Sequence, residues 1–378
     1  MEKGSTMSEK MGHPTDIQEM CSLPFVFGAN RVWRVYQGGK LIDVLQNKPH
    51  PEDSNFPEEW IASAVKANNP QRGDVAEGIS SAILGGRLFS FQELVNLHPE
   101  EMLGARHIRS FGKNTAFLTK LLDSAIRLPI QAHPDPVAAR KLYHSNFGKT
   151  ETWIILGTRE IASEEPYLML GFNDRLDEKI FKAEAVSGNM PQSLKMLHKH
   201  PVKPGDVLII SGGTAHAIGP GVFLLEIMEP TDFVVQPENY CGTQELTMGD
   251  RFGTLPPADA LEIFHYSSTS RQEAWGKALA IPTTIENNKY VKAVSLLDRK
   301  TVKFFGASRI NILKEWRFDN SEGTCTAGVL LSGACTLSVH KYKTHLKQGD
   351  CFFIPASCKT VKMSGQCDLL LAHPPFTM

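Results

Sequence analysis

The sequence predicts a mainly β fold in which two β units, each a sandwich or barrel of antiparallel strands, carry helical inserts. From about residue 115 onwards, short apolar runs alternate with turns rich in Gly, Pro, Asn and Asp, a pattern typical of such folds. A longer pattern also occurs twice, as KPGDVLIISGGTAH at 203–216 and as KQGDCFFIPASCKT at 347–360. Both copies place a basic residue and Gly-Asp before a short apolar run and a turn of small residues. The repeat indicates that the second unit follows the plan of the first.

Length and charge limit the classes of protein to which the chain can belong. The 378 residues suffice for about two or three domains with sizeable cores. Lys and Arg number 40 against 41 Asp and Glu, without a dense basic stripe, which argues against nucleic acid and acidic membranes as partners. The apolar runs are far shorter than the roughly 20 residues that span a bilayer, and the polar start lacks the core of a secretory signal. The seven scattered cysteines fit buried reduced thiols, so we expect a cytoplasmic protein.

The N-terminal region is expected to begin with a disordered tail over residues 1–20. The runs FVFGANRVWRVYQ (25–37) and KLIDVL (40–45) then carry β-branched and aromatic residues, which predicts strands. Further strands are expected at 117–124, 128–134, 151–158, 167–172, 206–211 and 222–230. We expect a catalytic domain over 21–285 and a second domain over 286–378, joined near the linker IPTTIENN.

Three segments space their apolar side chains for helices instead of strands. The first insert is expected to start a helix at Ser90 and to stop it at His98-Pro99, because serine caps helix starts and the residue before proline disfavours helix. The predicted helical segments are about 73–112, about 174–200 and, as a linking helix, about 256–281.

Polar residues of the first β unit fall in a pattern that favours a divalent metal site. Gln131 and His133 are two residues apart, so on a strand they share one face. Glu151 opens the next predicted strand, with Lys149 on the same face, and His216 lies in a turn of Gly, Ala and Thr that leaves room for a bound molecule. Each residue alone is weak evidence. Together, two imidazoles, one carboxylate and one amide are compatible with Zn²⁺ and an open position for substrate.

The remaining histidines do not extend this pattern. We interpret His198 and His200 as residues of a solvated helix end. In the second copy of the repeat, Thr360 takes the position of His216, and His340 and His345 lack a carboxylate at ligand spacing. The second unit is therefore expected to be structural, with one metal ion per chain.

Three motifs in order resemble type I mannose-6-phosphate isomerase, a zinc enzyme of the cupin fold. They are TKLLDSAIRLPIQAHPD (119–135), GKTETW (148–153) and GDVLIISGGTAHAIGPGVFLLEIMEPTD (205–232). The resemblance covers most of residues 20–378 and implies two cupin-type barrels or jelly rolls, the second one degenerate. It implies that the protein interconverts mannose 6-phosphate and fructose 6-phosphate through a cis-enediol and requires zinc. Its expected partner is therefore a small sugar phosphate.

The resemblance also implies roles for individual residues. The zinc ligands would be Gln131, His133, Glu151 and His216. Lys149 and Glu226 match polar pocket positions and would assist binding or proton transfer. The alternatives are a strand-end lysine and a solvent-facing carboxylate, and for Glu226 the two interpretations are nearly even. The implied substrate-binding positions are Trp60, which core packing would also explain, Asp232 and Arg140.

Two positions depart from the family pattern, and both lose capacity to bind an anion. Gln236 stands where the family usually has an arginine with a catalytic role, and Pro129 stands where it often has a hydroxyl residue near the phosphate. An amide cannot replace a guanidinium fork that clamps an oxyanion. Arg140, Lys141 or Arg251 would have to compensate.

Four functions therefore remain open. The first is the isomerase of mannose 6-phosphate and fructose 6-phosphate, and the second is an isomerase of an unphosphorylated or differently phosphorylated sugar. Two histidines and a glutamate also suit an Fe(II) oxygenase. The fourth function is that of a sugar-binding cupin that keeps the metal without turnover. Monomer and homodimer are both compatible with the sequence.

Overall fold

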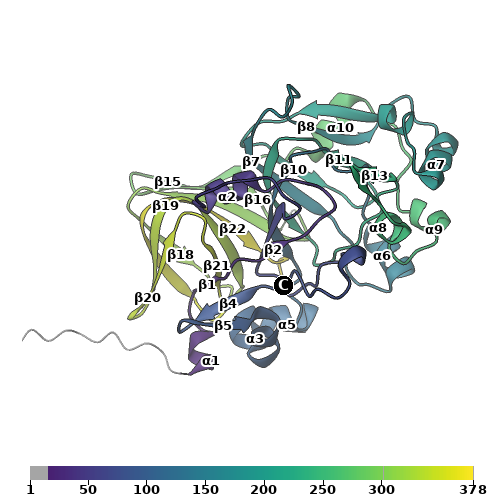
Figure 1. Cartoon of the computed structure of the whole chain (residues 1–378). Coiled ribbons are helices and arrows are strands. Elements are labelled where there is room, and N and C mark those ends of the chain that lie inside the picture. The colour runs from purple at the N-terminus through teal and green to yellow at the C-terminus, as the bar shows by residue number, and fades with distance from the viewer. Residues whose placement is uncertain (1–15, 301, 378) are drawn as a thin grey trace, which may run out of the picture.

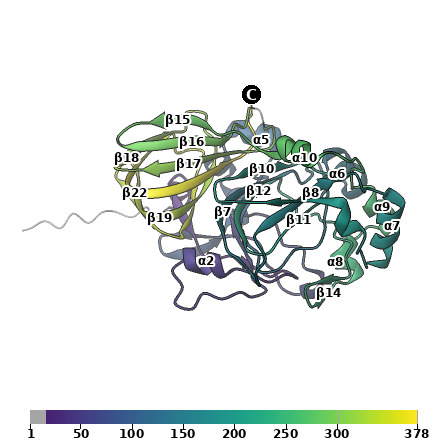
Figure 2. The ribbon, with the colours of Figure 1, turned by 90° about the horizontal axis from the view of Figure 1, so that it is seen from above.

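The computed structural model describes residues 16–300 and 302–377, and it shows two β units side by side (Figures 1 and 2). The first unit contains a six-stranded and a three-stranded antiparallel sheet, and the second is built on an eleven-stranded antiparallel sheet. The predicted mainly β class is confirmed. None of the described helices is both long and apolar enough to cross a membrane.

The first unit places its sheets and helices around the predicted site. Its six-stranded sheet runs in the order β10-β7-β12-β6-β3-β2, and its three-stranded sheet in the order β11-β8-β9. The strand bounds are β2 Arg31–Val32, β3 Glu58–Ile61, β6 Leu118–Asp123, β7 Glu151–Thr158, β8 Tyr167–Phe172, β9 Leu197–Pro201, β10 Val207–Ile210, β11 His216–Ile218, β12 Val222–Met228, β13 Tyr240–Cys241 and β14 Gln244–Glu245. The helices of this part are α2 Lys40–Leu45, η1 Pro70–Arg72, α3 Phe91–Leu97, α4 Pro99–Leu103, α5 Ala105–Phe111, α6 Pro136–Tyr143, α7 Glu178–Ser187, η2 Ser193–Met196, α8 Met248–Phe252, α9 Pro257–Leu261 and α10 Arg271–Ala278.

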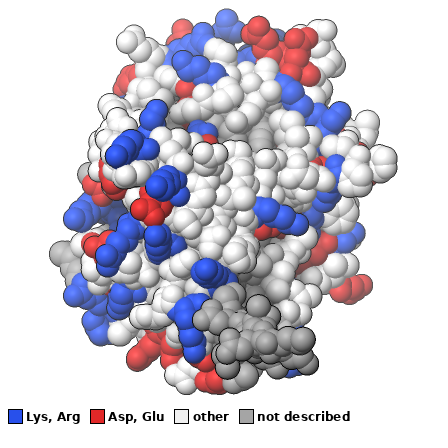
Figure 3. All heavy atoms as spheres, turned by 90° about the vertical axis from the view of Figure 1, so that its left-hand side faces the viewer, with Lys and Arg blue, Asp and Glu red and all other residues white. Residues whose placement is uncertain are grey.

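The sheet of the second unit also includes strands from the N-terminal region. Its path runs β15-β16-β17-β22-β19-β21-β1-β4-β5, with β18 beside β22 and β20 beside β19. The bounds are β1 Phe25–Phe27, β4 Ser81–Leu84, β5 Arg87–Ser90, β15 Thr283–Asn287, β16 Val291–Leu297, β17 Gly306–Ile312, β18 Glu315–Asp319, β19 Thr326–Val339, β20 Tyr342–Lys347, β21 Cys351–Ile354 and β22 Thr360–His373. The division at residue 285 stays a prediction. The face in Figure 3 carries Lys, Arg, Asp and Glu around a broad uncharged area.

The repeated Gly-Asp pattern forms the same local structure in both units. Gly205 and Gly349 both adopt a positive φ, of 96° and 87°, which favours glycine because it has no Cβ. Each following aspartate then accepts a hydrogen bond from the backbone N–H three residues before it: Asp206 from Lys203 at 3.0 Å and Asp350 from Lys347 at 2.8 Å. The strands β10 and β21 follow directly. The predicted internal repeat is therefore present as a turn and a strand.

The prediction of a strand at KLIDVL is wrong, because these residues form helix α2. Ile42 and Leu45, three residues apart, are buried on one face of this helix. The buried carboxylate of Asp123 accepts hydrogen bonds from the backbone N–H groups of Gly39 at 3.0 Å and Leu41 at 2.8 Å. A distant side chain thus satisfies the helix start, which the local sequence does not reveal.

The first predicted helical insert is partly confirmed. Ser90 caps α3, accepting a hydrogen bond from the backbone N–H of Glu93 at 3.4 Å, and α3 ends at Leu97, before His98-Pro99. The residues before Ser90 are not helical, since β4 and β5 form a hairpin there. The linking segment 256–281 forms two short helices, α9 and α10.

Other segments near chain turns also differ from the predictions. Residues 128–134 form no regular strand, only bridges at Gln131 and Ala132, because prolines at 129 and 134 supply no N–H donor. The expected linker forms β15, which pairs with β16. Of the expected tail, residues 1–15 lie outside the described residues. Residues 17–20 form α1 (Ile17–Met20), where Glu19 accepts a hydrogen bond from the Tyr342 hydroxyl at 2.6 Å.

The histidines of HKH lie on a strand and not at a helix end. His200 pairs with Leu168 of β8, is 4% exposed, and stacks on Trp275 with ring centroids 4.9 Å apart. His198 lies near the backbone carbonyl of Thr269, 2.8 Å away. Pairing with β8 therefore outweighs the local polarity of the segment. All seven cysteines are buried and free, as expected.

Candidate metal centre

Three ligand-type side chains meet at one end of the first β unit. Glu151 is the first residue of β7 and pairs with Ile210 of β10. His216 is the first residue of β11, and its backbone exchanges two hydrogen bonds with Gln131, of 2.8 and 2.9 Å. That bridge places the neighbouring His133 beside His216. Strand pairing thus brings together residues from three separate motifs.

The three side chains are nearly inaccessible and close together. His133, Glu151 and His216 are 2%, 1% and 1% exposed, and their ligand atoms all lie within 4.8 Å of one another. Glu151 lies between the imidazoles, with Oε2 at 3.4 Å from His133 Nε2 and Oε1 at 3.3 Å from His216 Nε2. Within the described residues this is the one group of three or more His, Cys, Asp or Glu with such spacing.

Backbone carbonyls orient both imidazoles. His133 Nδ1 lies 2.8 Å from the carbonyl oxygen of Phe233, and His216 Nδ1 lies 2.9 Å from that of Thr214. Because a carbonyl only accepts hydrogen bonds, each Nδ1 carries the proton, and in the neutral ring each Nε2 keeps its lone pair. Metal-ligating histidines are held in this way.

The donor set and its spacing fit a divalent metal. His216 Nε2 is a buried polar atom without a hydrogen-bond partner among the described residues. Neighbouring ligand atoms of a tetrahedral zinc site with bonds of about 2.1 Å are about 3.4 Å apart, as follows from the tetrahedral angle. The separations of 3.3 and 3.4 Å around Glu151 match this value. The site is thus consistent with a metal held by His133, Glu151 and His216.

Charges around the cluster keep its ligands in the forms that bind a metal. Burial, together with the charge of Lys149, lowers the pKa of His133 to about 4, so its imidazole is neutral at pH 7. Burial opposes ionisation of Glu151, but its interactions with His133, Lys149 and His216 hold its pKa well below the ordinary value. Lys149 Nζ lies 3.7 Å from Glu151 Oε2 and 3.2 Å from His133 Nε2.

A narrow pocket of about 80 Å³ opens beside this cluster. Gln131, the fourth predicted ligand, lines it, together with Lys149, Glu226 and Gln236. The volume is well below the 300–1,000 Å³ typical of sites for drug-sized ligands. The pocket therefore suits a small substrate.

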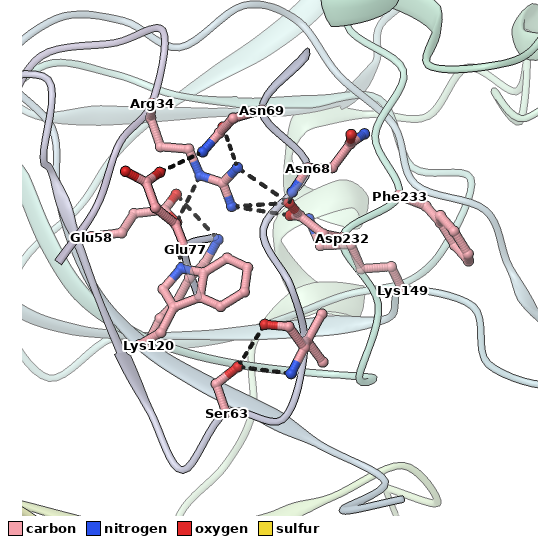
Figure 4. A network of polar contacts seen from close by, with 12 residues as sticks. Arg34, Glu58, Ser63, Asn68, Asn69, Glu77, Lys120, Lys149, Asp232 and Phe233 are labelled. Carbon is pink, nitrogen blue, oxygen red and sulfur yellow. Dashed lines mark hydrogen bonds and ion pairs between the residues drawn. The ribbon is translucent and has the colours of Figure 1, made fainter. Parts of the chain in front are cut away.

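A buried network of charged groups also lines this pocket, and Figure 4 shows its members Arg34, Glu58, Lys120 and Asp232. Lys120 Nζ lies 3.3 Å from both Glu58 Oε1 and Glu226 Oε2. Arg34 Nε donates to Glu58 Oε2 at 3.0 Å, and its Nη2 forms an ion pair with Asp232 Oδ1 at 3.1 Å. Glu226 pairs directly with Lys120 across β12 and β6. The wall thus alternates acidic and basic groups.

The two glutamates of this wall have opposite proton affinities. Burial disfavours the charge of Glu58, but the charges of Arg34 and Lys120 hold its pKa far below the ordinary value. Burial and the nearby charge of Glu151 raise the pKa of Glu226 to about 8, against the opposing effect of Lys120. Glu226 Oε1 is buried without a hydrogen-bond partner among the described residues. Of these two glutamates, Glu226 is therefore the one that holds a proton more strongly.

The structure places the other predicted residues as follows. Asp232 lines the pocket and binds Arg34, whereas Trp60 lies behind it, 1% exposed, donating from Nε1 to Glu58 Oε2 at 2.7 Å. Gln236 lines the pocket and donates from Nε2 to the backbone carbonyl of Asp250 at 2.9 Å. Arg140 is exposed on α6 and does not line the pocket, so the structure does not support its predicted contact with substrate.

Sequence reasoning missed Arg34, Glu58 and Lys120. The signal for Lys120 was a lysine among the leucines of the strand LTKLLD, which is buried throughout. A buried lysine requires a carboxylate partner, so such a position indicates an internal ion pair. Arg34 had no comparable signal, because its partner Asp232 is 198 residues away in sequence.

A larger cavity, of about 970 Å³, lies at the second unit. It is lined by Thr360, which occupies the position equivalent to His216, and by His340, Trp316 and Tyr290. Among the residues described around it, no group of ligand-type side chains converges. The expectation of one metal ion per chain rests on this difference between the units.

Acid is expected to destabilise the metal-free protein through His133. Its folded pKa of about 4 lies below the ordinary 6.5, so the unfolded chain binds the extra proton between these pH values. Lowering the pH from 6.5 to 4 should then reduce the free energy of unfolding by about 3 kcal/mol through this residue. Urea unfolding of the chelated protein measures the slope. In His133→Gln, the free energy of unfolding should depend less on pH between 6.5 and 4. An unchanged pH dependence in that variant would contradict the role of His133.

No family model matches the chain, but individual proteins do. A probable mannose-6-phosphate isomerase of Bacillus subtilis is 26% identical over 268 residues, which cover 70% of this chain and 76% of that protein. The mannose-6-phosphate isomerase of Streptococcus mutans is 25% identical over 280 residues, 73% of this chain and 80% of that protein.

Solved structures show the same fold. The crystal structure of mannose 6-phosphate isomerase from Bacillus subtilis matches with a TM-score of 0.71 at 22% identity, covering 93% of this chain and 99% of that one. A zinc-bound mannose 6-phosphate isomerase matches with a TM-score of 0.67 at 16% identity, covering 93% and 100%. By sequence and by structure, the chain is a relative of the mannose-6-phosphate isomerases.

Proposed function

We propose that the protein is a metal-dependent aldose–ketose isomerase that moves hydrogen between C1 and C2 of a hexose through a cis-enediol. The observation that carries the proposal is the buried cluster of His133, Glu151 and His216, whose Nε2 atoms and carboxylate converge beside a small polar pocket. We propose zinc as the metal and Gln131 as a fourth ligand. The names of the relatives support a sugar isomerase.

The bound metal would stabilise negative charge that develops on the C1 and C2 oxygens of the sugar. Lys149, beside the cluster, is placed to donate a hydrogen bond to one of these oxygens. Glu226 has a raised pKa and one unpartnered oxygen, so it suits the transfer of a proton from C2 to C1. Lys120 holds its other oxygen in place at 3.3 Å.

Two substrate pairs follow from the mannose and fructose skeleton: the 6-phosphates, as the relatives are named, and the free sugars. Incubation of the zinc-loaded protein with each of the four sugars, followed by chromatographic separation of aldose and ketose, tests the reaction. We expect interconversion within one pair. Absence of product from all four, with zinc retained, would contradict the proposed function.

Two other functions predict different results for the same protein and sugars. An Fe(II) oxygenase would consume dioxygen with iron and not with zinc. A sugar-binding protein without turnover would bind the sugar but leave its C2 hydrogen unexchanged.

A further inference from the structure

We propose that the substrate carries no phosphate, so that the pocket takes a neutral hexose such as mannose or fructose. The inference rests on the proposed isomerase function and names its substrate class. Its basis is that the described residues of the pocket leave no cationic side chain free to hold a phosphate group.

Two cations of the pocket wall are already bound by carboxylates. Lys120 lies between Glu58 and Glu226, at 3.3 Å from each. Arg34 directs its Nη1 and Nη2 groups at both oxygens of Asp232, at 3.1–3.2 Å, and its Nε at Glu58. Asp232 thus occupies the two guanidinium nitrogens that could otherwise form a bidentate contact with a phosphate.

The third cation, Lys149, lies at the reacting end. Its Nζ lies 3.7 Å from Glu151 Oε2 and 3.2 Å from His133 Nε2, within the proposed metal site. A 6-phosphate, by contrast, is attached four carbons away from C2. Lys149 therefore cannot serve both the reacting carbons and the phosphate.

Acidic side chains outnumber basic ones in the pocket wall. The basic residues are Arg34, Lys120 and Lys149, and the acidic ones are Glu58, Glu151, Glu226, Asp232 and Asp250. A phosphate dianion would lose hydration and face the carboxylates of Glu58, Asp232 and Asp250 without a new ion pair, which is unfavourable. A neutral sugar avoids this cost.

The helix start beside the pocket already holds a carboxylate of the chain. The start of α8 borders the pocket, but the carboxylate of Asp250 caps it, accepting from the Thr247 backbone N–H at 2.8 Å and the Thr247 hydroxyl at 2.6 Å. A carboxylate thus occupies the helix end that an anion would use.

The cations that the sequence offered as substitutes lie elsewhere. Arg251 is buried and donates to the backbone carbonyls of Pro237 at 3.0 Å and Ala185 at 2.6 Å. Arg140 and Lys141 lie on α6 and do not line the pocket. None of these three side chains supplies a cation to the pocket in place of the arginine that the family usually has at the position of Gln236.

The remaining polar groups at the pocket suit hydroxyls. Asn68 and Gln236 line it. An amide can both donate and accept hydrogen bonds, and the side-chain amide of Asn68 and Oε1 of Gln236 have no hydrogen-bond partner among the described residues. Sugar hydroxyls have the same dual character. The pocket is therefore polar but built for a neutral ligand.

The test compares four sugars in two independent measurements. Steady-state kinetics of the zinc-loaded protein should give a kcat/KM for mannose and fructose at least about tenfold higher than for their 6-phosphates. Inorganic phosphate at millimolar concentration should not inhibit. Calorimetric titration of each sugar decides the substrate class by binding even without turnover. Tighter binding or faster turnover of the 6-phosphates would overturn the inference and leave the isomerase function standing.

Two substitutions should create the missing anion site. Gln236→Arg adds a guanidinium at the pocket wall, and Asp232→Asn frees Arg34 from its carboxylate. Each should raise the ratio of kcat/KM for phosphorylated over free sugar by about tenfold or more. Gln366→Arg, on the exposed surface of the second unit, adds the same charge and should leave the ratio unchanged. A folded Gln236→Arg protein with an unaltered ratio would contradict the proposal.

Discussion

Glu151→Gln is expected to abolish metal binding and to lower kcat/KM by at least about a thousandfold. The carboxylate lies between the two imidazoles, at 3.4 Å from His133 Nε2 and 3.3 Å from His216 Nε2. A neutral amide of the same shape removes the one anionic ligand of the cluster and can turn an N–H towards an imidazole nitrogen. Elemental analysis of the purified variant and steady-state assays measure both effects.

A matched control separates this effect from a general loss of charge. Glu164→Gln removes the carboxylate of an exposed ion pair with Lys199 and should leave metal content and turnover unchanged. One metal ion per chain in Glu151→Gln, together with undiminished turnover, would show that the cluster is not the metal centre.

Lys120→Met should destabilise the protein by about 3 kcal/mol and remove most of its activity. The ammonium is the cation between Glu58 and Glu226, and its side chain is 5% exposed. Burial and Glu151 already raise the pKa of Glu226 to about 8. Without the ammonium, an ionised Glu226 would have no cation beside it, and the buried charge would destabilise the fold. Urea unfolding and kinetic assays measure the two losses.

The loss of stability in Lys120→Met should depend on pH in a defined direction. Removing the lysine raises the pKa of Glu226 further above its unfolded value, so the variant is less destabilised at pH 5 than at pH 8. Adding Glu226→Gln should recover most of the stability but not the activity. Lys199→Met, which removes an exposed cation, should cost little. A cost for Lys120→Met as small as that for Lys199→Met would contradict the role of the network.

The proximity of His133, Glu151 and His216 was predictable because these residues occur in motifs of fixed spacing. His133 lies two residues after Gln131, and Glu151 is the first residue of β7. His216 follows the Gly-rich turn after β10. The structure brings all three together even though residues 128–134 are not a regular strand. Two backbone bridges, one from Gln131 to His216, fix that segment as firmly as a strand would.

The parts that could not be predicted depend on contacts far apart in sequence. The composition of KLIDVL predicts a strand, and nothing local reveals that the distant Asp123 accepts hydrogen bonds at the start of a helix there. The pairing of Arg34 with Asp232 likewise joins two loops, and it engages the guanidinium of the pocket. The sequence showed the loss of arginine at Gln236, but only the structure shows that the described cations of the pocket are already paired.

We propose that the cluster of His133, Glu151 and His216 supports hydrogen transfer on a free hexose. A proton NMR time course of the zinc-loaded protein in D₂O, with fructose in one tube and fructose 6-phosphate in another, tests it most directly. We predict that the fructose tube forms mannose with deuterium entering at C2, and that the phosphate tube reacts much more slowly. Unchanged spectra in both tubes, with zinc confirmed in the protein, would contradict the account.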